Sequence, residues 1–241
     1  MKPGTWLFGA ILALTPLTAT AQNEDSEWQY SLGIYMFGSA LDGDVQVAGQ
    51  TAEVDLSFSD ILDNLELSAM GFLRAEKGRW AIMGDTIFFG LGASSERPPA
   101  DIDVDEFVFE IDGAYRVSDA VEVLFGARYV SIDTRIDTKG PLGLRFDDKN
   151  DWVDPVAGLR ITAPFLNSWA FIGRFDLAGF GVGSDLSWHL DLHLHYRTSD
   201  RFSFAFGYRT LDIDYDDGTG LDRFVYDVAA SGPDAALVIH F

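Results

Sequence analysis

Apolar and polar residues alternate with a period of two along most of the chain after residue 27. In the segment 188–197, apolar side chains occupy the even positions from Trp188 to Tyr196, and polar ones the odd positions from His189 to Arg197. The segment 202–209 repeats the pattern, with an aromatic ring at every even position. A helix, whose period is 3.6 residues, would spread these apolar residues around its axis. The pattern therefore predicts β-strands.

The same alternation predicts about ten strands, with eight as the alternative. They lie near 28–39, 66–77, 79–92, 104–116, 120–136, 151–163, 168–182, 185–197, 201–215 and 223–241. Short turns alternate with longer connections at 40–65, 93–103, 137–150 and 216–222, a habit of transmembrane β-barrels. The first long connection is expected to hold a small hairpin from Val45 to Val54 and a helical turn from Ser59 to Leu65, with the pair Ser59-Asp60 as its start.

The two faces of these strands differ in a way that suits a membrane. Aromatic residues such as Trp80, Trp169 and Tyr196 lie next to the short turns, where an interfacial girdle belongs. The opposite face carries charges in the middle of the strands, and many strands exceed the ~9–11 residues that cross a bilayer. A soluble fold whose charged face meets water is the alternative that the pattern leaves open. The predicted lumen charge network is Arg74, Asp85, Glu110, Asp112, Arg128, Asp154, Arg160, Arg174, Asp176, Asp191 and Arg209.

The first 21 residues read as an export signal. Lys2 precedes the apolar run from Trp6 to Leu17, and Ala19-Thr20-Ala21 matches the small-x-small cleavage pattern. A buried N-terminal helix is disfavoured, because Pro16 interrupts it and a polar segment follows. We therefore expect a signal peptide at 1–21 and one barrel domain at 22–241.

Composition excludes several function classes. The formal net charge of −21 counts against binding of nucleic acid phosphates. The absence of Cys rules out disulfides, thiolate zinc sites and cysteine nucleophiles.

The C-terminal segment alternates through Leu237 and Ile239 and finishes on Phe241, and this ending looks like the signal read by the outer-membrane insertion machinery. The chain resembles the small bacterial outer-membrane β-barrel proteins, and among them uncharacterised proteobacterial envelope barrels. The segments that carry this resemblance are 152–155, 158–160, 179–185, 207–209 and 231–233. It implies a closed antiparallel transmembrane barrel in the outer membrane of a Gram-negative bacterium, in contact with lipid, lipopolysaccharide and the insertion machinery, and a monomer. Pro233 departs from the strand pattern, and a bulge or bend is expected there.

The expected lumen is narrow. About ten strands enclose less space than the 16–18 strands of a porin, so opposite charges inside are expected to pair, since buried charges require partners. A narrow selective pore is the alternative.

The sequence pattern that most suggests a metal site is a run of histidines. One strand face carries His189, Asp191, His193 and His195, with ~6.6 Å between successive residues. This spacing is too wide for all of them to bind one metal ion, so a site here would need a ligand from another strand. They are candidate metal ligands, and lumen hydrogen bonding is the simpler interpretation.

Enzymatic activity is disfavoured. A hydrolase acting on lipid A or peptides would use residue types such as those of His193, Ser187 and Asp191. These three lie on one strand at fixed separations, which keeps them beyond hydrogen-bond distance of one another. The sequence also contains no G-x-S-x-G motif. No cofactor is predicted. Acidic residues cluster in the long connections, where weak Ca²⁺ or Mg²⁺ binding next to lipopolysaccharide phosphates is an option, although the segment 212–223 fails the calcium-loop pattern. The sequence thus predicts a non-enzymatic barrel serving envelope structure, interaction or minor solute passage.

Overall fold

The computed structural model describes residues 27–47, 50–96, 99–139 and 145–241. The predicted signal peptide lies outside the described residues. Within the described part of the chain, no helix combines the length and the apolar character that a membrane crossing requires.

Strands dominate the described residues. The elements are β1 (Gln29–Phe37), β2 (Ala40–Val47), β3 (Gln50–Leu56), α1 (Phe58–Asn64), β4 (Leu65–Lys77), β5 (Trp80–Glu96), β6 (Pro99–Arg116), β7 (Val121–Thr138), β8 (Arg145–Leu166), β9 (Trp169–Ala178), β10 (Leu186–Arg197), β11 (Phe202–Asp217), a 3₁₀ turn η1 (Gly220–Asp222) and β12 (Phe224–His240).

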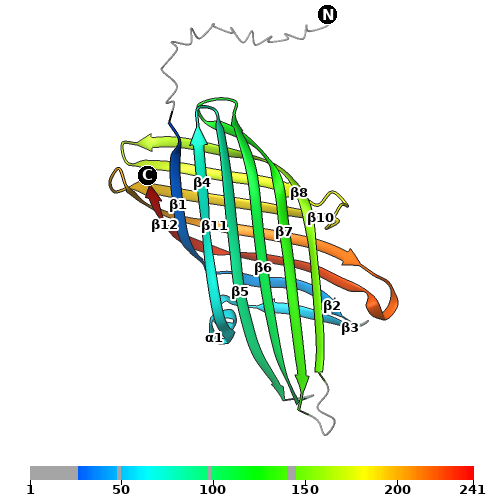
Figure 1. Ribbon diagram of the computed structural model, residues 1–241. Coiled ribbons are helices and arrows are strands. Elements are labelled where there is room, and N and C mark those ends of the chain that lie inside the picture. Colours follow the sequence, from blue (N-terminus) through cyan, green and yellow to red (C-terminus); the bar gives the residue numbers. More distant parts are fainter. Residues whose placement is uncertain (1–26, 48–49, 97–98, 140–144) are drawn as a thin grey trace, which may run out of the picture.

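Ten of these strands close an antiparallel barrel (Figure 1). From β4 to β12 each strand pairs with the next along the chain, and β1 pairs with both β4 and β12. The hairpin β2–β3 extends the sheet beyond β12 on the outer half of the molecule. The predicted ten-strand barrel, its small hairpin and its short helix are confirmed, and the eight-strand alternative is wrong.

Both ends of the barrel wall meet at the side of the short turns. There Phe241 donates its backbone N–H to the carbonyl of Tyr30 at 2.9 Å, and short turns join β4 to β5, β6 to β7, β8 to β9 and β10 to β11. In transmembrane barrels the short turns face the periplasm. We call this the periplasmic end and the opposite end the outer end.

Strands β5 to β8 project beyond the rest of the barrel at the outer end (Figure 1). Two segments expected to be loops, 93–103 and 137–150, instead belong largely to strands, because β5 runs to Glu96 and β8 starts at Arg145. Oppositely charged cross-strand neighbours explain part of this extension, since such pairs stabilise a ladder. Between β7 and β8, Asp133 lies opposite Lys149, Arg135 opposite Asp147, and Asp137 opposite Arg145.

The irregularity expected at Pro233 lies in the neighbouring strand. β12 runs through Pro233 without a break, whereas the chain opposite changes from β1 to β2 at Gly38 and Ser39. Proline has no N–H to donate, but its carbonyl accepts the N–H of Gly38 at 2.8 Å. The start of the short helix also differs from the prediction, because the N-cap of α1 is Ser57 rather than Ser59.

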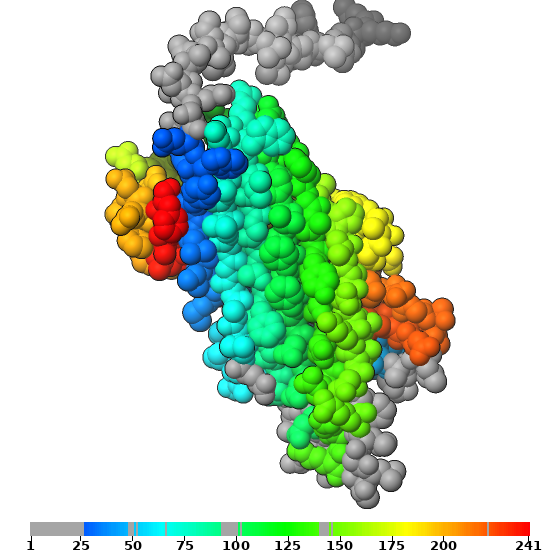
Figure 2. All heavy atoms as spheres, viewed as in Figure 1, coloured from blue at the N-terminus to red at the C-terminus, as the bar shows by residue number. Residues whose placement is uncertain are grey.

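The barrel is apolar outside and charged inside at mid-height. Ile34, Met36 and Phe206 point outward and are 62%, 78% and 54% exposed, whereas Arg128 and Asp176 are buried in the lumen. Near the periplasmic end Trp80 contacts Tyr115, and Trp169 contacts Tyr196, each at 4.7 Å between ring centroids. Figure 2 shows β4 to β8 as a continuous outer wall. Such inverted polarity in a closed sheet is that of a transmembrane β-barrel.

Candidate functional site: the filled lumen

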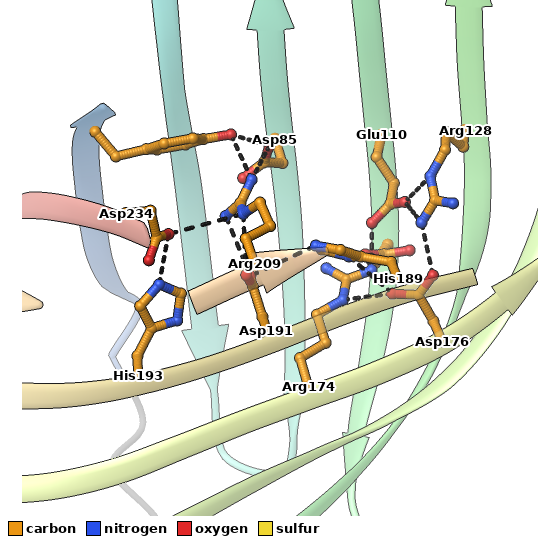
Figure 3. Close-up of polar contacts among 12 residues, drawn as sticks. Asp85, Glu110, Arg128, Arg174, Asp176, His189, Asp191, His193, Arg209 and Asp234 are labelled. Carbon is orange, nitrogen blue, oxygen red and sulfur yellow. Dashed lines mark hydrogen bonds and ion pairs between the residues drawn. The ribbon is translucent and has the colours of Figure 1, made fainter. Parts of the chain in front are cut away.

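A group of ionised side chains crosses the lumen near mid-height (Figure 3). Arg128 of β7 is 1% exposed; its Nε donates to Glu110 Oε2 at 2.7 Å, and its Nη2 donates to Asp176 Oδ1 at 2.6 Å. Arg174 of β9 donates to Glu110 and to Asp176 Oδ2, and forms an ion pair with Asp112 at 2.9 Å. Register explains part of this arrangement, because Glu110 and Arg128 lie directly opposite each other on β6 and β7.

A second group surrounds Arg209 of β11. Its Nε and Nη2 donate to the two oxygens of Asp191 at 2.9 and 3.1 Å, and its Nη1 donates to Tyr35 Oη at 2.8 Å. Tyr35 in turn donates to Asp85 at 2.7 Å. Arg209 also forms longer ion pairs with Asp85 and Asp234, both at 3.8 Å. We call the three arginines 128, 174 and 209, together with the carboxylates that they contact, the central ion layer.

A third group lies closer to the periplasmic end and is called the Arg74 group. Arg74 Nη2 donates to Glu122 Oε1 at 2.7 Å and to Glu76 at 2.9 Å, and Arg160 Nη1 donates to Glu122 Oε2 at 3.1 Å. Arg116 approaches the same two glutamates at 3.5 and 3.6 Å. Glu122 joins three arginines, although the sequence reasoning did not select it. Its lumen position at the start of β7, in register with Arg160 on β8, is the signal that could have identified it.

One member of the predicted network has a different role. Asp154 accepts hydrogen bonds from the backbone N–H and the hydroxyl of Ser184, both at 2.7 Å, and from Trp152 Nε1 at 3.3 Å. It therefore anchors the connection between β9 and β10 to β8.

An apolar cluster fills the outer half of the lumen, a feature that the sequence reasoning missed. The rings of Trp152 and Tyr215 stack with centroids 3.9 Å apart and planes 8° from parallel. Around them pack Val130, Ile132 and Ile213, all buried, and Ile61 of α1. The signal was available in the sequence, because several lumen-facing positions change from charged to apolar toward the outer end. On β7, for example, the lumen-facing Arg128 is followed by Val130 and Ile132. We call this cluster the apolar plug.

Neighbouring cavities lie among the described residues on the periplasmic side of the apolar plug. A cavity of about 100 Å³ is lined by His193 and by members of the central ion layer that include Asp191 and Asp234. A vestibule of about 740 Å³ reaches the short turns at Asp119 and Asn167. His195, Arg74 and Arg160 line both cavities, which are therefore neighbours.

The predicted metal ligands are divided among different contacts. His189 binds Asp176 at 3.2 Å, whereas His193 Nε2 lies 2.6 Å from Asp234 Oδ2. Within the described residues, the ligand atoms that lie within 4.8 Å of one another belong to Asp191, His193 and Asp234. The expected set of four does not converge, because alternate residues of one strand are too widely spaced. Asp234, which sequence reasoning missed, comes from β12, two strands away.

The residue types of a hydrolase are also kept apart. Ser187 Oγ accepts a hydrogen bond from Arg128 Nη1 at 2.9 Å, whereas His193 contacts Asp234.

The outer surface of the sheet carries a row of carboxylates. In the registers of β11, β12, β2 and β3, Asp214 lies opposite Asp227, Asp227 opposite Asp44, and Asp44 opposite Glu53. We call these four residues the acidic row; all four are exposed.

Two local contacts at the outer end shift pKa values. Asp216 accepts hydrogen bonds of 2.5 and 2.9 Å from Arg223, and these contacts raise the pKa of Arg223. In α1, hydrogen bonds from Ser57 lower the pKa of Asp60.

Neutralising the centre of the acidic row is expected to stabilise the protein. Like charges directly opposite each other destabilise a sheet by about 0.2–1 kcal/mol per pair, and Asp227 has two such neighbours. Asp227→Asn should therefore raise the midpoint of urea unfolding at low ionic strength, and the difference from wild type should shrink in high salt. Asp200→Asn, in a short turn at the other end, serves as the control. A lower midpoint for Asp227→Asn would contradict repulsion within the row.

Comparisons with known proteins give a likeness of structure alone. No protein-family model and no curated protein matches the chain. Among solved structures, Ail, the attachment invasion locus protein of Yersinia pestis, is similar over 89% of this chain and 99% of its own, with 11% identity and a TM-score of 0.40. The translocator domain of the autotransporter NalP from Neisseria meningitidis is similar over 91% and 90%, with 11% identity and a TM-score of 0.45. Neisserial surface protein A is similar over 89% and 96%, with 11% identity and a TM-score of 0.31.

Proposed function

We propose that this chain is a barrel of the bacterial outer membrane, that it is not an enzyme and has an occluded lumen, and that it serves envelope structure and interaction through its outer surface. The observation that carries this proposal is the filling of the lumen by two successive layers. The central ion layer crosses it at mid-height, and the apolar plug fills its outer half. Ions cross an apolar constriction poorly, because they lose their hydration shell there.

The acidic row supports an outward-facing role. It places four exposed carboxylates on rigid strands at the outer end, next to the region where lipopolysaccharide surrounds such a barrel. We propose lipid and lipopolysaccharide as the immediate surroundings, the insertion machinery as the partner in assembly through Leu237, Ile239 and Phe241, and the monomer as the working form.

The test of occlusion is conductance in planar lipid bilayers. The purified barrel is expected to leave the membrane silent over many insertions, because the apolar plug blocks hydrated ions. Heat-modifiable gel mobility of the same sample verifies that the inserted protein is folded, and a general porin of 16–18 strands serves as the conducting control. Discrete, reproducible current steps from the folded protein would contradict occlusion and favour the narrow selective pore.

The hydrolase alternative has its own test. Mass spectra of lipid A from cells with and without the protein are expected to be identical, since Ser187 and His193 are engaged with different partners. A difference that requires His193 would overturn the assignment as a non-enzyme.

A further inference from the structure

The charges of the central ion layer do not balance. Its three arginines contact six carboxylates, namely Asp85, Glu110, Asp112, Asp176, Asp191 and Asp234. The Arg74 group has the opposite surplus, with three arginines against two glutamates. With neutral histidines the two groups together carry a charge of −2. Buried carboxylates require compensation, so these groups call for a divalent cation or for additional protons.

One place in the layer has the donors for a cation. His193 Nε2 and one oxygen from each of Asp191 and Asp234 lie within 4.8 Å of one another. The second oxygen of Asp234, Oδ1, is buried and has no hydrogen-bond partner among the described residues, and the Asp234 side chain is 1% exposed. Figure 3 shows His193 and Asp234 pointing toward each other beside Arg209 and Asp191.

The strand register produces this convergence. His193, Gly207 and Asp234 lie in one row across β10, β11 and β12. A Cβ atom at position 207 would lie 2.2 Å from the His193 ring and 2.8 Å from Asp234 Oδ1. The absence of a side chain at Gly207 therefore lets the imidazole and the carboxylate meet across the middle strand.

From these contacts we propose that Asp191, His193 and Asp234 form a binding site for a divalent transition-metal ion, with zinc as the probe. One imidazole nitrogen and carboxylate oxygens are donors that such ions accept. Arg209 donates to both oxygens of Asp191 and thereby fixes the orientation of this ligand, as hydrogen-bond partners of metal ligands do. A bound divalent ion brings two positive charges, which offset the charge of −2 that the central ion layer and the Arg74 group carry together.

Access to the site runs from the periplasmic side. His193 and Asp234 line the cavity of about 100 Å³, which neighbours the vestibule, whereas the apolar plug closes the outer side. The ion therefore enters and leaves through the vestibule and does not cross the membrane. The metal site does not decide the proposed envelope role, because the apolar plug packs in the outer half of the lumen whether or not an ion is bound.

The experiment is calorimetric titration of zinc chloride into the folded, metal-depleted barrel in detergent. Wild type is expected to show saturable binding at a single site. Removing a residue that only hydrogen-bonds to a metal ligand weakens metal binding about 10- to 100-fold. His193→Ala removes a ligand itself and should therefore weaken zinc binding at least about tenfold. His195→Ala is the matched control, because His195 is the next lumen-facing residue of the same strand and lines the same cavity. It should bind zinc as wild type does.

A second variant and a spectroscopic measurement keep the test decisive. Asp234→Asn retains the shape of the side chain and should also weaken binding, and heat-modifiable mobility verifies the fold of each variant. Cobalt in place of zinc should give visible absorption bands in wild type and His195→Ala, and these should be lost in His193→Ala. Absence of saturable zinc binding in wild type would overturn the proposal and leave protons as the compensating charge. Equal binding in wild type, His193→Ala and Asp234→Asn would also overturn it and assign the zinc to other sites such as the acidic row.

Discussion

Replacing Arg128 by methionine is expected to destabilise the folded barrel by about 3–5 kcal/mol, because removing one partner of a buried ion group leaves the others uncompensated. Arg128 is 1% exposed and contacts Glu110, Asp176 and Ser187. Without it, Glu110 and Asp176 share only Arg174 as a common arginine partner. Methionine fills part of the vacated volume, so the effect reports mainly the lost charge. Urea unfolding of the barrel in lipid vesicles, followed by gel mobility without boiling, measures it.

The matched control is Arg223→Met at the outer end. Arg223 also binds a carboxylate, that of Asp216, but its side chain is 43% exposed. Water screens exposed ion pairs, which therefore contribute little to stability, so this variant should remain close to wild type. If the two variants lost similar stability, the central ion layer would have no special role in holding the barrel together.

Removing the ring of Trp152 should have the second large effect. Trp152 is buried in the apolar plug, stacks on Tyr215 and donates a hydrogen bond to Asp154. Replacing a buried tryptophan by alanine costs about 3–5 kcal/mol through lost burial and the cavity left behind. Trp152→Ala should therefore lower the urea midpoint strongly in the same gel assay.

The conservative variant Trp152→Phe separates packing from the hydrogen bond. Phenylalanine preserves an aromatic contact with Tyr215 but cannot donate to Asp154, so most of the stability should return. A loss as large as that of Trp152→Ala would show instead that the bond to Asp154, and through it the Ser184 connection, dominates.

The alternation of residues determined the barrel, its approximate strand number and the direction of its faces. In a strand, successive side chains point to opposite faces, so the outward positions of Ile34 and Phe206 and the inward positions of Arg128 and Asp191 follow from parity. A backbone in hydrocarbon must pair all its polar groups, which requires closure. The hairpin and the short helix were visible as local turn and cap signals.

The partners inside the lumen depended on the tertiary structure. Parity places His193 in the lumen, but only strand register and barrel closure bring Asp234 to it across Gly207. In the same way, Asp154 meets Ser184 rather than forming the expected ion pair, because the connection after β9 folds back over β8. Contacts across the lumen depend on the order, tilt and stagger of all the strands, and no local pattern encodes these.

The sequence by itself thus determined a closed barrel with an apolar exterior. The alternation of side chains along a strand and the need to pair backbone groups are both local constraints. Tertiary structure decided which apolar side chains pack together in the outer half of the lumen, and which carboxylates share which arginine. These properties depend on which side chains meet across the closed wall, and they arise only when β1 pairs with β12.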